Sequence, residues 1–151
     1  MQNTASSISD ISTILLIMLL GYTGIAKLID FKGFRTAIFN QPFPNEWGEI
    51  KAVAVPVIEL AIVGLLLFRT TRLIGFIGAL IMMTIFSVYV GLIWMGAFER
   101  TPCGCAGILD AMGWGEHLAV NIGFTLLAAF AILIEGNSKK IRVLPKSVIF
   151  K

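Results

Sequence analysis

Four long stretches with almost no charged residues restrict what this chain can fold into. They span residues 11–29, 52–68, 73–98 and 118–134. Each has about 17 to 26 residues, enough for a helix to cross a hydrocarbon core of about 30 Å. With 57% hydrophobic and only 14% charged residues and a mean hydropathy of +0.88, the chain is too apolar for a water-soluble domain. Because lipid offers no hydrogen bonds to the backbone, these runs must be helical.

We therefore predict an all-α integral membrane protein, an antiparallel bundle of four transmembrane helices that forms one domain over residues 1–151. The predicted helices cover about residues 11–29, 47–68, 72–98 and 116–135, followed by a basic cytoplasmic tail at 136–151. Asp10 is placed to cap the first helix. The turn from Arg69 to Arg72 is so short that the second and third helices must be antiparallel neighbours.

The basic residues set the predicted orientation. Four crossings leave one side with Arg69, Arg72, Lys139, Lys140, Arg142, Lys146 and Lys151, and the other with Lys27, Lys32, Arg35, Lys51 and Arg100. Since cytoplasmic loops carry an excess of Lys and Arg, we expect a bacterial inner-membrane protein with both termini in the cytoplasm. The basic residues follow membrane topology rather than a soluble basic face, so we expect the lipid bilayer and no nucleic acid as a partner.

A short amphipathic segment, residues 30–40, follows the first apolar run. One helical face carries its apolar residues, Phe31, Phe34 and Ile38. This pattern predicts a short interfacial helix in the first outer loop. Lys27, just before it, is expected to extend its long side chain to the membrane interface. Gly21 and Gly24 are expected to face a neighbouring helix, because small residues allow close approach in lipid.

Cys103 and Cys105, the only cysteines, are separated by one glycine in the predicted outer loop before the fourth helix. Gly104 can adopt backbone angles that let the two side chains meet. A disulfide closing so small a loop would stabilise the fold by only about 1.6 kcal/mol in the chain-entropy model. Strained, exposed disulfides are the readily reduced kind. The spacing therefore favours a redox pair that faces the periplasm.

Two other interpretations of the cysteines stay open. They could be small apolar residues or a structural bridge in a tight loop. They could also bind a metal, for which the nearby candidates are Asp110, Met112, Glu116 and His117. Such a set of thiolate, thioether and imidazole ligands would suit Cu(I) better than zinc.

Two further polar residues stand out, one inside an apolar run and one directly before another. Glu59 is an ionisable residue inside the second helix, where it must face the bundle and pair, transfer a proton or contact a quinone. Its hydrogen-bonding candidates on the first helix are Tyr22, Thr23 and Lys27. His117, the only histidine, opens the fourth helix near both cysteines and could transfer the proton when a thiol exchanges; a capping or interfacial role is the alternative. Asn121 shares its helical face.

Several of these residues form a pattern that resembles the methylamine-utilisation MauE family, within the DoxX-like group of four-helix membrane proteins. The matching residues are Gly24 to Lys27, Asp30, Phe31, Phe34, Pro56-x-x-Glu59, Pro102-Cys103-Gly104-Cys105-Ala106-Gly107, Trp114, His117 and Asn121. Ala106 departs from the family pattern, which has phenylalanine or glycine there. The resemblance implies a redox or maturation factor that acts with disulfide-handling partners. MauE proteins are associated with maturation of methylamine dehydrogenase, and DoxX relatives with thiosulfate:quinone and thiol oxidation.

Together these features predict a membrane thiol–disulfide redox or maturation factor, with Cys103, Cys105, His117 and Glu59 as site residues. Its expected partner is a periplasmic thioredoxin-like or disulfide-containing client. No cofactor is certain from the residues, and a quinone is the candidate electron acceptor. The alternatives are a non-enzymatic subunit or scaffold of a larger membrane complex, with a structural cysteine pair, and a copper or other metal carrier.

Overall fold

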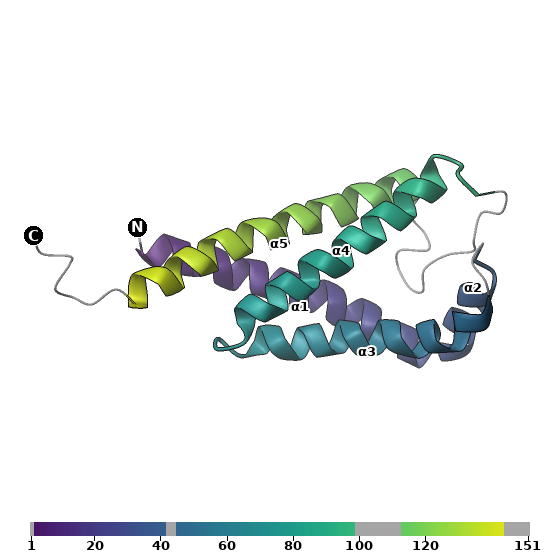
Figure 1. Ribbon diagram of the computed structural model, residues 1–151, viewed down its shortest axis with the longest axis horizontal. Coiled ribbons are helices and arrows are strands. Elements are labelled where there is room, and N and C mark those ends of the chain that lie inside the picture. Colours follow the sequence, from purple (N-terminus) through teal and green to yellow (C-terminus); the bar gives the residue numbers. More distant parts are fainter. Residues whose placement is uncertain (1, 42–44, 99–112, 144–151) are drawn as a thin grey trace, which may run out of the picture.

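Five α-helices make up the fold in a computed structural model that describes residues 2–41, 45–98 and 113–143. They are α1 (Gln2–Ile29), α2 (Phe31–Phe39), α3 (Gly48–Leu67), α4 (Arg72–Trp94) and α5 (Trp114–Val143), with a 3₁₀ turn, η1 (Asn45–Trp47), before α3. The described residues contain no strand. Figure 1 shows the four long helices side by side and the short α2 at one end.

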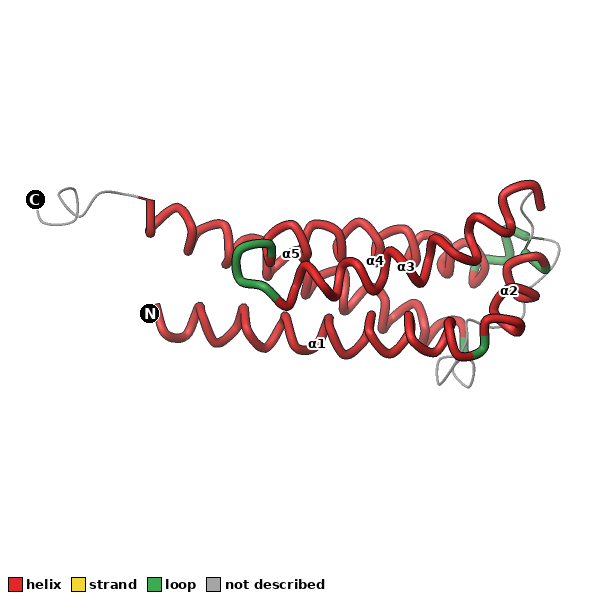
Figure 2. The backbone as a smooth tube through the Cα atoms, turned by 90° about the horizontal axis from the view of Figure 1, so that it is seen from below, coloured by secondary structure: helices red, strands yellow, loops and turns green. Residues whose placement is uncertain are grey.

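The four long helices form an antiparallel bundle in which α1 packs against α3 and α5, and α4 packs against the same two helices. The start of α1, the end of α5 and the α3–α4 turn lie at one end of the bundle (Figures 1 and 2). We call the opposite end, where α2 lies, the α2 end. All four helices are long and apolar enough to cross a membrane. The predicted all-α membrane bundle is confirmed, and the chain is a multi-pass protein of the lipid bilayer.

A core of aliphatic, aromatic and methionine side chains fills the centre of the bundle. Its fully buried members include Leu16, Leu20, Leu66, Phe76, Ala79, Ala128 and Ala131. The outward faces carry exposed apolar residues on every long helix, as expected where lipid is the solvent. Gly24 lies where α1 meets α3, and a Cβ there would come within 3.3 Å of Glu59 and 3.2 Å of Leu60. The expected contact of Gly24 with a neighbouring helix is confirmed.

The start of α1 differs from the prediction, because the helix begins at Gln2 rather than at residue 11. The prediction of Asp10 as its cap is wrong: Asp10 accepts hydrogen bonds from Arg72 Nη1 at 2.6 Å and Arg69 Nη2 at 3.2 Å. The hydroxyls of Ser12 and Thr13 bond back to carbonyls of the extension, four residues earlier in each case. The apolar run begins at residue 11, whereas the helix itself begins more than two turns earlier, at Gln2.

The other boundaries also shift at the membrane edges. Helix α4 ends at Trp94 rather than residue 98, because Gly96 takes a left-handed conformation with φ of +70° and the N–H groups of Met95 and Gly96 bond back into the last turn. Helix α5 continues to Val143, well past the predicted end at 135. Gly136, Asn137 and Ser138 are poor helix formers, but Lys139 and Lys140 favour a helix and the next proline is Pro145, so no proline interrupts this segment.

Helix α2 confirms the short amphipathic helix predicted for residues 30–40. Asp30 caps it by accepting a hydrogen bond from Gly33 N at 3.1 Å. Phe34 and Ile38 are buried against Ala52 of α3. On the exposed side, Arg35 forms an ion pair with Glu49 of α3, and the hydrogen bond raises the pKa of Arg35 above its ordinary value. These contacts hold α2 across one end of the bundle.

Candidate functional site

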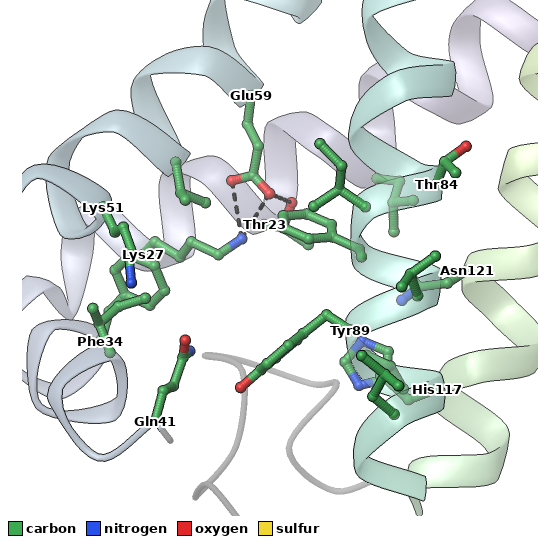
Figure 3. Close-up of a pocket in the computed structure, with 18 residues that line it drawn as sticks. Thr23, Lys27, Phe34, Gln41, Lys51, Glu59, Thr84, Tyr89, His117 and Asn121 are labelled. Atoms are coloured by element: carbon green, nitrogen blue, oxygen red, sulfur yellow. Dashed lines mark hydrogen bonds and ion pairs between the residues drawn. The ribbon is translucent and has the colours of Figure 1, made fainter. Parts of the chain in front are cut away.

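A cavity of about 620 Å³ opens in the α2 end of the bundle. Each of the five helices contributes to its lining, which is mostly aliphatic and aromatic. Its polar lining residues are Thr23, Lys27, Gln41, Lys51, Glu59, Thr84, Tyr89, His117 and Asn121. Figure 3 shows Lys27, Thr23 and Glu59 on one side of this pocket and His117 and Asn121 on the other. Apolar walls with a few convergent polar groups are typical of small-molecule sites.

An ion pair between α1 and α3 forms the first wall. The ammonium group of Lys27 lies 2.7 Å and 2.9 Å from the two carboxylate oxygens of Glu59, and Thr23 Oγ1 donates to Oε1 at 3.1 Å. Glu59 is completely buried and Lys27 is 6% exposed. Glu59 lies about 16 Å along α3 from Gly48 at the helical rise of about 1.5 Å per residue. The charges therefore face each other inside the bundle.

Lys27 corrects one prediction and confirms another. The expectation that its side chain reaches the membrane interface is wrong, because the ammonium turns into the bundle to meet Glu59. The phenyl rings of Phe34 and Phe86 flank it, each with its centroid 5.7 Å from Nζ. The expected hydrogen bonding of Glu59 to the first helix is confirmed for Thr23 and Lys27.

The opposite wall belongs to the first two turns of α5. His117 is 6% exposed, and its imidazole stacks on the indole of Trp114 with 6.5 Å between ring centroids and 8° between planes. Asn121, one turn further, is 5% exposed, and its Nδ2 has no hydrogen-bond partner among the described residues. Because a buried donor without a partner is unfavourable, Asn121 marks a place for an acceptor.

The structure brings two of the four predicted site residues, Glu59 and His117, to the same pocket. Cys103 and Cys105 lie outside the described residues, in the segment 99–112. The end of α4, before this segment, and the start of α5, after it, both lie on the α2 side of the bundle (Figure 1). Among the described residues, no group of three or more His, Cys, Asp or Glu side chains could hold a metal.

The sequence-based interpretation assigned no role to Gln41, Lys51, Thr84 and Tyr89, which also line the pocket. A signal for some of them existed in the spacing. Lys51, Val55 and Glu59 follow one another at intervals of four on α3, and Leu19, Thr23 and Lys27 do so on α1. Residues four apart share a helical face, so the position of Glu59 could have predicted that Lys51 faces the same cavity.

Fold and site together define a class: multi-pass four-helix membrane proteins with a largely apolar pocket between the helices at one end, which contains a buried ion pair. The model of the family described as methylamine utilisation protein MauE matches residues 5–134, most of the chain. The chain belongs to the MauE family, as the resemblance in its sequence predicted. Comparisons with curated proteins and with solved structures found no match.

Proposed function

We propose that this protein is a membrane thiol–disulfide redox factor that oxidises a partner through Cys103 and Cys105 and passes the electrons to a quinone. The partner is an extracytoplasmic thioredoxin-like or disulfide-containing protein. In this proposal both termini lie in the cytoplasm of a bacterial cell, and the α2 end faces the periplasm. The cysteines would then meet their partner on the oxidising side of the inner membrane.

The pocket is the observation that carries this proposal. It combines apolar walls with a buried ion pair and a buried amide donor. A lipid-soluble ring with polar oxygens, such as a quinone, suits these properties. The pocket also lies at the end where α4 stops and α5 starts, so the chain that carries both cysteines leaves and re-enters the bundle beside it.

The proposed reaction proceeds in two balanced steps. In the first, a thiolate of the partner attacks the Cys103–Cys105 disulfide, and a second partner thiol resolves the mixed disulfide; the partner gains a disulfide and both cysteines become thiols. In the second, the two cysteines re-form their disulfide and release two electrons and two protons, which a quinone bound in the pocket takes up to become a quinol. The protein returns to its starting state.

His117 and Glu59 have separate roles in this scheme. His117 accepts a proton from a cysteine thiol when the Cys103–Cys105 disulfide re-forms in the second step, since imidazole can exchange a proton near neutral pH. Glu59 holds the ammonium of Lys27 at the pocket wall, where that ammonium can donate a hydrogen bond to a quinone oxygen. The proton acceptor and the ammonium that contacts the quinone would thus lie on opposite walls of one cavity.

The proposal is tested by the midpoint potential of the cysteine pair in the purified full chain, together with partner oxidation by Cys103→Ser and Cys105→Ser. We expect a potential above about −300 mV, since robust structural disulfides lie below that value, and loss of oxidation in both variants. A lower potential with active serine variants would instead support a scaffold with a structural bridge. One bound metal equivalent that both variants lose would support a metal carrier.

A further inference from the structure

The amide of Asn121 is the most conspicuous unused group in the pocket. Its side chain is 5% exposed, comes from α5, and points toward the cavity in Figure 3. The Nδ2 donor has no partner in the described part of the chain, although the backbone carbonyl of the same residue accepts a bond from Thr125 Oγ1 at 2.7 Å. The side chain therefore lies beside the cavity with a buried hydrogen-bond donor that no described residue accepts.

Lys27 offers a second donor from the opposite side. An ammonium group has three N–H bonds, and the two carboxylate oxygens of Glu59 receive two of them. The third is left for another acceptor. Because Glu59 balances the charge of Lys27, this donor does not require an anionic ligand. The side chain also lines the cavity between Phe34 and Phe86, which leaves apolar surface around the donor.

The Glu59 oxygens that contact Lys27 already accept hydrogen bonds. Oε1 of Glu59 accepts from Lys27 and Thr23, and Oε2 accepts from Lys27. The hydroxyl of Thr84, also in the lining, donates to the carbonyl of Leu80 at 2.7 Å. A ligand that bonds to both donors therefore needs two separate acceptor atoms, and the aliphatic and aromatic part of the lining suits an apolar body.

We propose that Asn121 and Lys27 form a two-donor clamp that binds the two carbonyl oxygens of a quinone head group. This inference rests on the proposed function and names the residues that hold its electron acceptor. A quinone head group has two opposed carbonyl acceptors and no O–H or N–H donor, and the molecule also carries an apolar tail. One carbonyl accepts from Asn121 Nδ2 and the other from the remaining N–H of Lys27, while the aromatic and aliphatic walls contact the ring.

The clamp also distinguishes the two redox states of the ligand. A carbonyl oxygen offers only lone pairs to the donors. The oxygen of a quinol hydroxyl is a weaker acceptor than a carbonyl oxygen, and its proton needs an acceptor of its own, whereas the Glu59 carboxylate already accepts three of the about four hydrogen bonds it can accept. The site therefore binds the oxidised form more tightly than the reduced form. Such a preference favours release of the product after each electron transfer.

Binding can be measured without any thiol chemistry. The full chain carrying Cys103→Ser and Cys105→Ser is placed in phospholipid nanodiscs and titrated calorimetrically with a benzoquinone that bears a decyl tail, and then with the matching quinol under anaerobic conditions. Asn121→Leu removes the amide at similar volume. Thr13→Val is the matched control, since it removes a buried hydroxyl on α1 that bonds to the carbonyl of Ser9 and does not line the pocket.

We expect the quinone to bind about tenfold more weakly to the Asn121→Leu protein than to the parent, and equally well to the Thr13→Val protein. In the parent, we expect the quinol to bind more weakly than the quinone. Equal affinity of Asn121→Leu and its parent, or no quinone binding, overturns the clamp, even if the wild type passes electrons to a quinone by another site. Asn121-dependent binding in a protein whose wild type oxidises no thiols supports the clamp and refutes the proposed function. Should Asn121→Leu not fold, equal binding of quinone and quinol to the parent overturns the clamp.

Discussion

Lys27 and Glu59 carry opposite charges inside the membrane-spanning part of the bundle, where an isolated ion is very unfavourable. Each is made tolerable by the other, by the hydroxyl of Thr23 and by the rings of Phe34 and Phe86. Buried ion pairs rarely add much net stability over an apolar pair of similar size. A pair kept at the wall of a cavity is therefore better explained by what it offers to a ligand.

Replacing Lys27 alone is expected to be far more harmful than replacing both partners. Lys27→Met leaves the carboxylate of Glu59 buried without its cation and should lower the free energy of unfolding by about 3–5 kcal/mol. The double variant Lys27→Met/Glu59→Leu should recover most of this loss, because no unpaired charge remains. Unfolding in detergent measures both. A double variant as unstable as the single one would contradict this account of the pair.

His117 is expected to matter for rate rather than for folding. His117→Phe keeps a ring to stack on Trp114 but removes the nitrogen that can accept a thiol proton. General acid–base catalysis contributes about 10²–10⁴-fold, so anaerobic single-turnover oxidation of the reduced protein by quinone should slow by about 10²-fold or more. Trp114→Phe retains the imidazole and serves as the control. A wild-type rate in His117→Phe would remove His117 from the mechanism.

At the scale of helices, Gly24 sets how closely α1 approaches α3 beside the ion pair. A methyl group there would lie 3.2 Å from Leu60 and 3.3 Å from Glu59, closer than ordinary van der Waals contact. We expect Gly24→Ala to lower the free energy of unfolding by about 1 kcal/mol, because overpacking forces neighbours to shift. Gly64→Ala on α3 is the matched control, since no atom lies within 4 Å of the added carbon. Equal stability of the two variants would argue against close packing at Gly24.

The positions of helices were more predictable from the sequence than their ends or their partners. Four apolar runs predicted the four spanning helices, because any backbone crossing lipid must bond to itself. The early start of α1 and the extension of α5 escaped prediction, since a helix can continue in water where hydropathy falls. The inward turn of Lys27 was predicted only in part: Lys27 was a candidate partner of Glu59, but its nearness to a helix end suggested an interfacial position. Only the fold brings α3 opposite.

For the whole molecule, the proposed orientation puts the pocket and the segment 99–112 on the extracytoplasmic side. The basic residues of the α3–α4 turn and the C-terminal segment support this orientation through the positive-inside rule. A membrane-impermeant maleimide applied to intact spheroplasts should label Cys103 and Cys105 after reduction. A cysteine introduced at Thr70 in a Cys103→Ser/Cys105→Ser background should react only after the membrane is permeabilised. The reverse labelling pattern would contradict the orientation and the proposed partner.

The family assignment and the pocket support each other at this scale. The family match covers residues 5–134, and all the residues that line the cavity lie within that range. The proposed function needs the whole arrangement: cysteines at one end, a cavity beside them and a membrane that supplies a lipid-soluble acceptor. In this function, electrons pass from the cysteine pair to a quinone.

The most direct test follows the reduced full chain, purified and mixed anaerobically with a short-chain benzoquinone in nanodiscs. Quinone absorbance and free thiols are recorded in the same sample. The account predicts that one quinone is reduced for each two thiols lost, with no reaction in the Cys103→Ser/Cys105→Ser protein. Thiols that stay reduced in the presence of excess quinone, or quinone reduction that persists in the serine variant, would contradict it.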